Sequence, residues 1–258
     1  MKSFNTKIIA ISNQKGGVGK TTSAVNIATY LAITETPTLL IDMDPQANAP
    51  SGLGVNVSPK IKSIYDVLIN NLKIETCIQK TEIEFLDILP SCSKLAGAEI
   101  ELVGMLSRES ILKEALKEYL GKYKYIIIDS PPSLGLLTVN VFTAADSLII
   151  PIQCEYYALE GLSQLLNTVR LIQNNLNPML EIEGVLITMY DSRLNLSKQV
   201  VEEVSQYFGK KVYKTFIHRN VKLGEAPGFG KPIILYDVAS TGSQNYMSLV
   251  SEILNNHE

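Results

Sequence analysis

Residues 14–22 of this 258-residue chain read Gln-Lys-Gly-Gly-Val-Gly-Lys-Thr-Thr, and this stretch decides the fold. An apolar run at residues 8–11 precedes it, and a helical pattern of apolar residues follows at 24–31. A strand, a glycine-rich loop and a helix in this order are the context that a phosphate-binding P-loop requires. Glycines let backbone N–H groups turn inward around a phosphate chain, and the helix adds its positive N-terminal end. The stretch therefore predicts an α/β nucleotide-binding fold.

Three side chains of the loop carry the expected chemistry. Lys20 supplies a point charge for the outer phosphates, and the Thr21 hydroxyl is placed to ligate Mg²⁺. Lys15, ahead of the glycines, is not needed by an ordinary Walker A loop, and a lysine at this place marks the deviant Walker A ATPases. We assign Lys15 and Lys20 to catalysis as well as to binding. The expected nucleotide contacts of the loop are Lys15, Gly16, Gly17, Val18, Gly19, Lys20, Thr21 and Thr22.

Two further apolar runs end in aspartates: residues 39–41 lead into Asp42 and Asp44, and residues 125–128 lead into Asp129. Ligands of open α/β sheets bind beyond the carboxyl ends of the strands. Asp42 and Asp44 are therefore near the phosphates if their strand neighbours the P-loop strand. Asp129 has the Walker B arrangement and is expected to hold Mg²⁺. Of Asp42 and Asp44, one would position Mg²⁺ and the second would orient the attacking water. We assign Asp42 to the metal and Asp44 to catalysis, and Asp42 becomes the catalytic candidate if Asp44 is dispensable.

Short apolar runs alternate with helical patterns along the rest of the chain. Such alternation implies βαβ units with right-handed crossovers. We expect a mainly parallel twisted sheet with helices on both faces, of P-loop NTPase type, forming a single ATPase domain over residues 1–258 without a separate N-terminal DNA-reading module. Strands are predicted at 7–12, 38–42, 85–89, 125–129, 147–151, 184–189 and 211–216, and helices at 21–34, 107–120, 136–144, 159–174, 196–208 and 243–255.

Composition sets limits on function. Apolar residues make up 46% and charged residues 19%, which is ordinary for a soluble globular protein. No run of 18 apolar residues and no secretory signal are present, so we expect a cytoplasmic protein. Cys77, Cys92 and Cys154 are widely spaced and are read as reduced thiols. The net charge of −3 argues against nucleic-acid binding through the whole surface, so such binding requires a local patch.

The most basic stretch of the chain is 204–224, which contains five lysines and arginines and no acid. Arg219 and Lys222 belong to it, and Arg193 lies on an earlier loop. Composition alone leaves a solvated lysine-rich surface as an equal alternative to a DNA-binding patch. His257 is expected in a frayed C-terminal tail.

The motifs together resemble the ParA/Soj chromosome- and plasmid-partitioning ATPases of bacteria, over nearly the whole chain. The residues that carry the resemblance lie at 13–22, 42–46, 129–135, 151–161 and 219–227. The first block is typical of the whole superfamily. The last two are much more specific to the Soj branch.

The resemblance implies a homodimer that encloses ATP and Mg²⁺ between its subunits and separates after slow hydrolysis. It implies that Lys15 reaches the partner's nucleotide and that the ATP-bound dimer coats nucleoid DNA without regard to sequence. A ParB-type centromere-binding protein would stimulate hydrolysis. Arg193 and Lys222 match DNA-contacting positions of relatives, and Arg219 is added to this patch. His218, where proline is more usual, and Asn220 match positions at the nucleotide base.

Three other functions are less well supported by the same motifs. A membrane-cycling ATPase like MinD needs a basic amphipathic C-terminal helix. Residues 247–258 are acidic and lack lysine, so no membrane partner is expected. A nitrogenase-type iron–sulfur reductase needs a bridging pair of cysteines near the nucleotide, and the three cysteines are not at suitable positions. A scaffold without useful turnover is disfavoured by Asp44 and Asp129.

Overall fold

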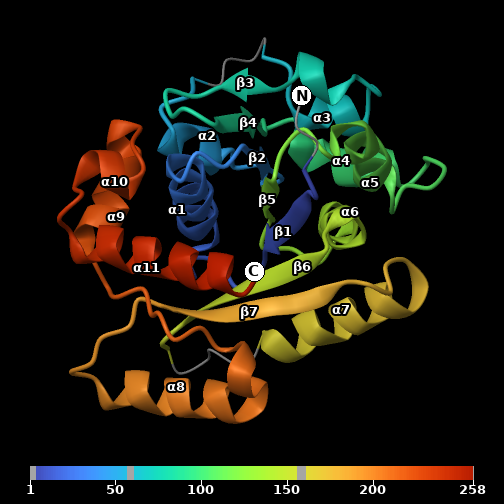
Figure 1. The fold of residues 1–258 in the computed structure, drawn as a ribbon. Coiled ribbons are helices and arrows are strands. Elements are labelled where there is room, and N and C mark those ends of the chain that lie inside the picture. The colour runs from blue at the N-terminus through green and yellow to red at the C-terminus, as the bar shows by residue number, and fades with distance from the viewer. Residues whose placement is uncertain (1–3, 57–60, 156–160, 258) are drawn as a thin grey trace.

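The structure is a computed structural model that describes residues 4–56, 61–155 and 161–257. Its centre is a seven-stranded sheet of order β3-β4-β2-β5-β1-β6-β7 (Figure 1). All neighbouring strands are parallel except β3, which runs antiparallel to β4. The strands are β1 (Lys7–Ile11), β2 (Thr38–Asp42), β3 (Gln79–Lys80), β4 (Leu86–Leu89), β5 (Tyr125–Asp129), β6 (Ser147–Gln153) and β7 (Glu181–Thr188).

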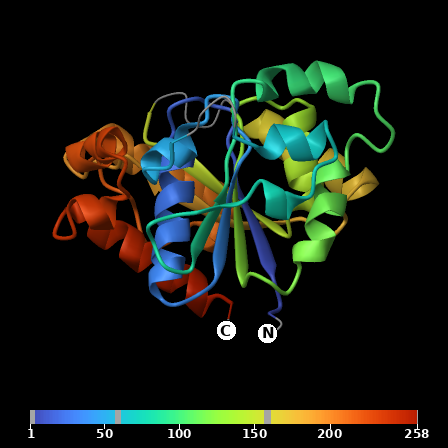
Figure 2. The same cartoon turned by 90° about the horizontal axis from the view of Figure 1, so that it is seen from above.

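Helices cover both faces of the sheet, as Figures 1 and 2 show. One face carries α1 (Lys20–Ile33), α2 (Asn48–Gly52), α9 (Val221–Glu225), η4 (Ala226–Phe229), α10 (Ile233–Tyr236) and α11 (Thr241–Asn255). The other carries α3 (Ile64–Leu68), η1 (Ile74–Thr76), α4 (Leu95–Leu102), α5 (Ile111–Leu116), η2 (Lys117–Tyr119), α6 (Leu136–Ala144) and α7 (Leu162–Asn175). Near the β7 edge lie α8 (Asn195–Phe208) and η3 (Gly209–Lys211).

The core forms two layers because successive strand residues point to opposite faces. In β1, Ile8 and Ala10 belong to the cluster beneath α3 to α8. Ile9 and Ile11 belong to the cluster beneath α1 and α11. Strands covered on both faces have no polar side, which explains their almost continuous apolar sequence. The predicted α/β fold of P-loop NTPase type is confirmed.

The predicted strand at 211–216 is wrong. Within this segment the structure shows one isolated bridge, Val185 with Val212, and a second, Tyr190 with His218, lies just beyond it. The backbone N–H groups of residues 214 and 215 donate instead to the two carboxylate oxygens of Glu252 on α11, at 2.8 and 3.1 Å. A side chain thus takes the donors that a regular strand would use.

Other boundaries also differ. The helix predicted at 107–120 begins only at Ile111, because Ser107 has a positive φ of 52° that a right-handed helix excludes. Residues 159–160 of the helix predicted at 159–174 lie outside the described residues. His257 is not frayed: its Nε2 lies 2.6 Å from Glu183 Oε1, and its ring stacks on Tyr125. No helix in the described part of the chain is long and apolar enough to cross a membrane.

Candidate active site

The P-loop, residues 12–19, joins β1 to α1 at the carboxyl edge of the sheet. Gly17 and Gly19 have φ of 75° and 86°, a region that side-chain-bearing residues rarely adopt. A Cβ atom added to Gly16 or Gly17 would meet nothing within 4 Å. The loop is therefore an open backbone cradle in front of the N-terminus of α1, where an anion is favoured.

Two residues to which the sequence assigned no role hold the loop in place. The Thr188 hydroxyl, at the end of β7, donates to the Val18 carbonyl at 2.9 Å in a buried bond. The Asn13 amide donates to the Pro151 carbonyl at 2.7 Å, and its Oδ1 accepts the Lys15 N–H at 3.0 Å. Their position at carboxyl ends of strands was the available signal, since ligand sites of such sheets form there.

The strand ending at Asp42 does not neighbour the P-loop strand, because β5 lies between β2 and β1. Asp129 pairs in register with Asp42 on one side and with Ile11 on the other. Asp129 is thus the strand-end acid next to the P-loop. Both Asp42 oxygens accept backbone N–H groups, from Asp44 at 2.9 Å and from Ala49 at 3.1 Å, so Asp42 holds the loop that carries Asp44.

Asp129 is the acid whose surroundings fit a bound cation. It is fully buried, and neither carboxylate oxygen has a hydrogen-bond partner among the described residues. Burial raises the pKa of Asp129 to about 7, although the neighbouring Thr21 hydroxyl and the Lys20 charge act in the opposite direction. Unpaired carboxylate oxygens beside a hydroxyl are the hard oxygen ligands that Mg²⁺ prefers.

The remaining charges of the site depend on one another. Lys20 is 7% exposed and donates through Nζ to the Lys15 carbonyl at 3.0 Å. Burial lowers the pKa of Lys20, whereas the charges of Asp129 and Asp44 raise it. Burial and the charge of Asp129 raise the pKa of Asp42 well above its ordinary range. Three carboxyls and one lysine in a buried cluster favour an additional cation.

Lys15 is engaged within its own protomer. Its Nζ lies 2.8 Å from Oε2 of Glu155, which follows β6, and the two side chains are 32% and 47% exposed. No role was predicted for Glu155 from the sequence. Because the pair is partly exposed to solvent, its net contribution is small and the lysine is free to exchange partners.

His218 and Asn220 line one pocket together with the P-loop. This cavity of about 320 Å³ is also bordered by Gly19, Thr188 and Tyr246 of α11. The Asn245 side chain holds His218 through its backbone N–H at 3.1 Å and its ring Nδ1 at 3.2 Å. The position of this pocket, at the start of α1, suits the base of a nucleotide whose phosphates lie in the loop.

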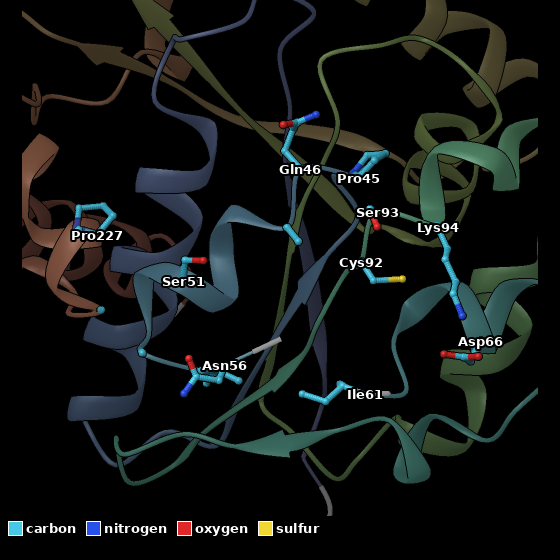
Figure 3. Close-up of a pocket in the computed structure, with 15 residues that line it drawn as sticks. Pro45, Gln46, Ser51, Asn56, Ile61, Asp66, Cys92, Ser93, Lys94 and Pro227 are labelled. Carbon is cyan, nitrogen blue, oxygen red and sulfur yellow. The ribbon is translucent and has the colours of Figure 1, made fainter. Parts of the chain in front are cut away.

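A second cavity, of about 620 Å³, lies beside the loop that follows Asp44 (Figure 3). Pro45 and Gln46 border it, as do Cys92 and Lys94 near the start of α4 and Pro227 of η4. None of the predicted site residues lines it. No sequence pattern indicates this cavity, because its walls come from four separate segments.

The three predicted DNA contacts lie outside the P-loop, on two segments of the chain. Arg193 is on the loop between β7 and α8, and its side chain is 86% exposed. Arg219 precedes α9, and Lys222 lies in its first turn. Arg219 also borders the base pocket. Arg193 and Lys222 are each paired with an acid of the same chain, Asp191 and Glu225.

The sheet order and the glycine-rich cradle define this protein as a P-loop NTPase, and Lys15 ahead of the glycines is the mark of the deviant Walker A type. A family model described as an AAA domain matches residues 6–182. The chain is 58% identical to the sporulation initiation inhibitor protein Soj of Bacillus subtilis, covering 97% of this chain and 99% of that protein. It is 54% identical to the chromosome partitioning protein ParA of Myxococcus xanthus, covering 96% and 88%. The chain therefore belongs to the ParA/Soj family of chromosome-partitioning ATPases, as the sequence resemblance predicted.

Solved structures agree with this fold. A protein from Mycobacterium smegmatis named cobyrinic acid a,c-diamide synthase, solved with an ATP analogue and magnesium, has a TM-score of 0.86 at 34% identity. The match covers 98% of this chain and 96% of that one.

Proposed function

We propose that this protein is a DNA-segregation ATPase that works with ATP and Mg²⁺, forms an ATP-enclosing homodimer and binds DNA without sequence preference. Dimer dissociation would follow slow hydrolysis stimulated by a ParB-type partner, in the cytoplasm at the nucleoid. The observation that carries the ATPase part is the buried, unpaired carboxylate of Asp129 beside Thr21 and Lys20, at the mouth of an open glycine cradle. Identity to Soj and ParA supports the partitioning role.

Each residue has a distinct task in this proposal. The glycine cradle and Lys20 hold the phosphates, and Thr21 and Asp129 would hold Mg²⁺, which offsets phosphate charge when bound. Asp42 fixes the backbone of the Asp44 loop through its two N–H contacts. Asp44 is 9% exposed and accepts the Gln46 N–H at 2.9 Å through Oδ1. This leaves Oδ2 of Asp44 to orient a water molecule for attack.

Lys15 supports the dimeric part of the proposal. It is not needed in cis, because the Lys20 Nζ already lies in the loop and Lys15 is turned toward Glu155. A lysine at the mouth of the cradle, held by a solvent-screened pair, is suited to reach a second nucleotide across a dimer interface. Its release from Glu155 would then accompany dimerisation.

Sedimentation of one protein sample tests the proposal. Sedimentation velocity with ATP and Mg²⁺ should show a dimer, and samples with ADP or no nucleotide should show a monomer. Co-sedimentation should recover the ATP form with scrambled duplex DNA and leave it in the supernatant with liposomes. A chain that stays monomeric with ATP contradicts the dimer, and equal DNA binding with ATP and ADP contradicts the switch.

A further inference from the structure

The loop after β7 and the segment before α9 lie side by side. The Tyr190 N–H donates to the Ile217 carbonyl at 3.0 Å, and the Arg219 N–H donates to the Tyr190 carbonyl at 3.0 Å. This pairing brings Arg219 close to Asp191, which is 28 positions earlier in the sequence. The same two segments border the base pocket through Met189 and His218. The proposed DNA surface and the nucleotide pocket therefore share backbone.

Asp191 binds Arg193 through two parallel hydrogen bonds. Nε of Arg193 donates to Oδ1 at 2.9 Å and a terminal nitrogen donates to Oδ2 at 2.6 Å. The Arg193 backbone N–H also donates to Oδ1, at 3.0 Å. Hydrogen bonds from Arg193, together with the charges of Arg193 and Arg219, lower the pKa of Asp191 to about 2. The carboxylate is thus charged at neutral pH and occupies the fork with which an arginine recognises a phosphate.

Lys222 has a similar partner. Its Nζ lies 3.2 Å from Glu225 Oε2 and 5.6 Å from the centre of the Tyr236 ring. Glu225 also accepts the Tyr236 hydroxyl at 2.9 Å. Among the described residues, two of the three proposed DNA contacts are therefore neutralised by acids of the same protomer.

We infer that Asp191 is a built-in competitor for DNA phosphate: it binds the guanidinium of Arg193 beside the segment that carries Arg219, and DNA must displace it to bind Arg193. Glu225 acts in the same way on Lys222. This inference rests on the proposed DNA-binding function and adds its regulation. One protomer offers three cations against two acids, so its surface attracts DNA weakly. Two protomers joined by ATP bring two such surfaces to one duplex.

The competing acids change the expected salt dependence of DNA binding. Six free phosphate contacts per dimer would give a slope of log K against log salt of about −5. A net charge of one per protomer predicts a slope of only about −2 for the wild type. Asp191→Asn restores one positive charge per protomer, so its slope should steepen toward about −4. Asparagine keeps Oδ1 for the Arg193 N–H and so preserves the turn.

The experiment compares wild type, Asp191→Asn and Glu114→Gln in DNA titrations at several salt concentrations, with ATP and Mg²⁺. Glu114 forms an exposed pair with Lys117 at 2.6 Å on α5, a helix that carries none of the proposed DNA contacts, and its substitution makes the same change in net charge. Circular dichroism and sedimentation velocity establish that each variant is folded and dimeric. Glu225→Gln is the second variant, in case Asp191→Asn fails to fold.

We expect Asp191→Asn to bind DNA at least fivefold more tightly than wild type near physiological salt, with the steeper slope, and Glu114→Gln to match wild type. A folded, dimeric Asp191→Asn that binds no more tightly than wild type overturns the inference, and so does an equal gain from Glu114→Gln. If Asp191→Asn does not fold, unchanged DNA binding by Glu225→Gln overturns it. If neither the wild type nor any variant binds DNA in the presence of ATP, that result would instead overturn the proposed function.

Discussion

At the residue scale, the two aspartates that follow β2 have separate roles. Both carboxylate oxygens of Asp42 accept backbone N–H groups, whereas only one oxygen of Asp44 does so, from Gln46. Removing Asp42 leaves two buried donors unpaired, which costs stability of about 1–3 kcal/mol for each group. Removing Asp44 should cost less stability, because it frees only the N–H of Gln46, an exposed residue that water can reach. We therefore expect the two substitutions to separate stability from catalysis.

We predict that Asp44→Ala keeps ATP affinity but stops turnover and traps the dimer on DNA. Orientation of the water matters in the transition state far more than in the ground state. The turnover number should fall about 100-fold or more, within the range for removal of general acid–base assistance. Phosphate release and equilibrium ATP binding measure the two effects. Hydrolysis at the wild-type rate would make Asp42 the catalytic candidate.

A second residue-scale prediction concerns the 2.8 Å pair of Lys15 and Glu155. Glu155→Gln should free Lys15 and lower the protein concentration needed for ATP-dependent dimerisation by roughly two- to fivefold, as expected for a partly exposed pair. Lys15→Ala should bind ATP, because Lys20 remains, but hydrolyse it poorly. Sedimentation equilibrium with ATP and Mg²⁺ measures dimerisation, and Glu114→Gln is the control. Weaker dimerisation of Glu155→Gln would mean that Glu155 positions Lys15 instead.

At the scale of elements, a close backbone contact docks η4 onto the end of α2. Gly54 and Gly230 have φ of 69° and 65°, and a Cβ added to Gly230 would lie 2.9 Å from the Gly54 Cα atom. Only two glycines allow this approach. The contact links the loop that carries Asp44 to the segment that carries Lys222.

Gly230→Ala should therefore destabilise the protein by about 2–3 kcal/mol, since left-handed backbone strain of about 1–2 kcal/mol adds to the overlap with α2. Urea unfolding measures the change. Gly228→Ala is the matched control, because a Cβ there meets nothing within 4 Å and its φ is not in the left-handed region. Equal stabilities of the two variants would show that the contact does not hold η4.

At the scale of the whole molecule, His257, which follows α11, is bonded to the edge of the sheet opposite the nucleotide site. His257 bonds Glu183 at 2.6 Å and lies 3.0 Å from the Tyr125 hydroxyl. The Ser147 hydroxyl also donates to Glu183 at 2.6 Å, and Lys7 lies 3.5 Å away. One carboxylate thus connects β1, β6 and β7 with the residues after α11.

This network predicts a specific dependence of stability on pH. Burial alone would raise the pKa of Glu183, but the His257 and Ser147 hydrogen bonds and nearby positive charges lower it from 4.5 to about 2. Because the folded-state pKa is depressed, the stabilisation is complete above pH 4.5 and is lost as pH falls toward 2. Glu183→Gln should cost about 1–2 kcal/mol at pH 7 and nothing near the lower limit. Chemical unfolding across pH measures this, and a cost independent of pH would contradict it.

The sequence by itself determined the P-loop, most strands of the sheet and the identity of the strand-end acids. These features are local: glycine spacing, apolar runs and the residue after a strand are set by neighbours in the chain. For the same reason the helical pattern at 136–144 was predicted with its observed bounds as α6.

Only the tertiary structure decided which distant residues meet. It placed β5 between β2 and β1, so that Asp129 and not Asp42 lies next to the P-loop. It anchored Val18 with Thr188, 170 positions away, and bonded the backbone of Arg219 to that of Tyr190. It also paired the backbone N–H groups of residues 214 and 215 with the Glu252 carboxylate, and the predicted strand there does not form. Such contacts depend on how helices and strands pack. A local sequence pattern carries no information about which distant residue will lie opposite it.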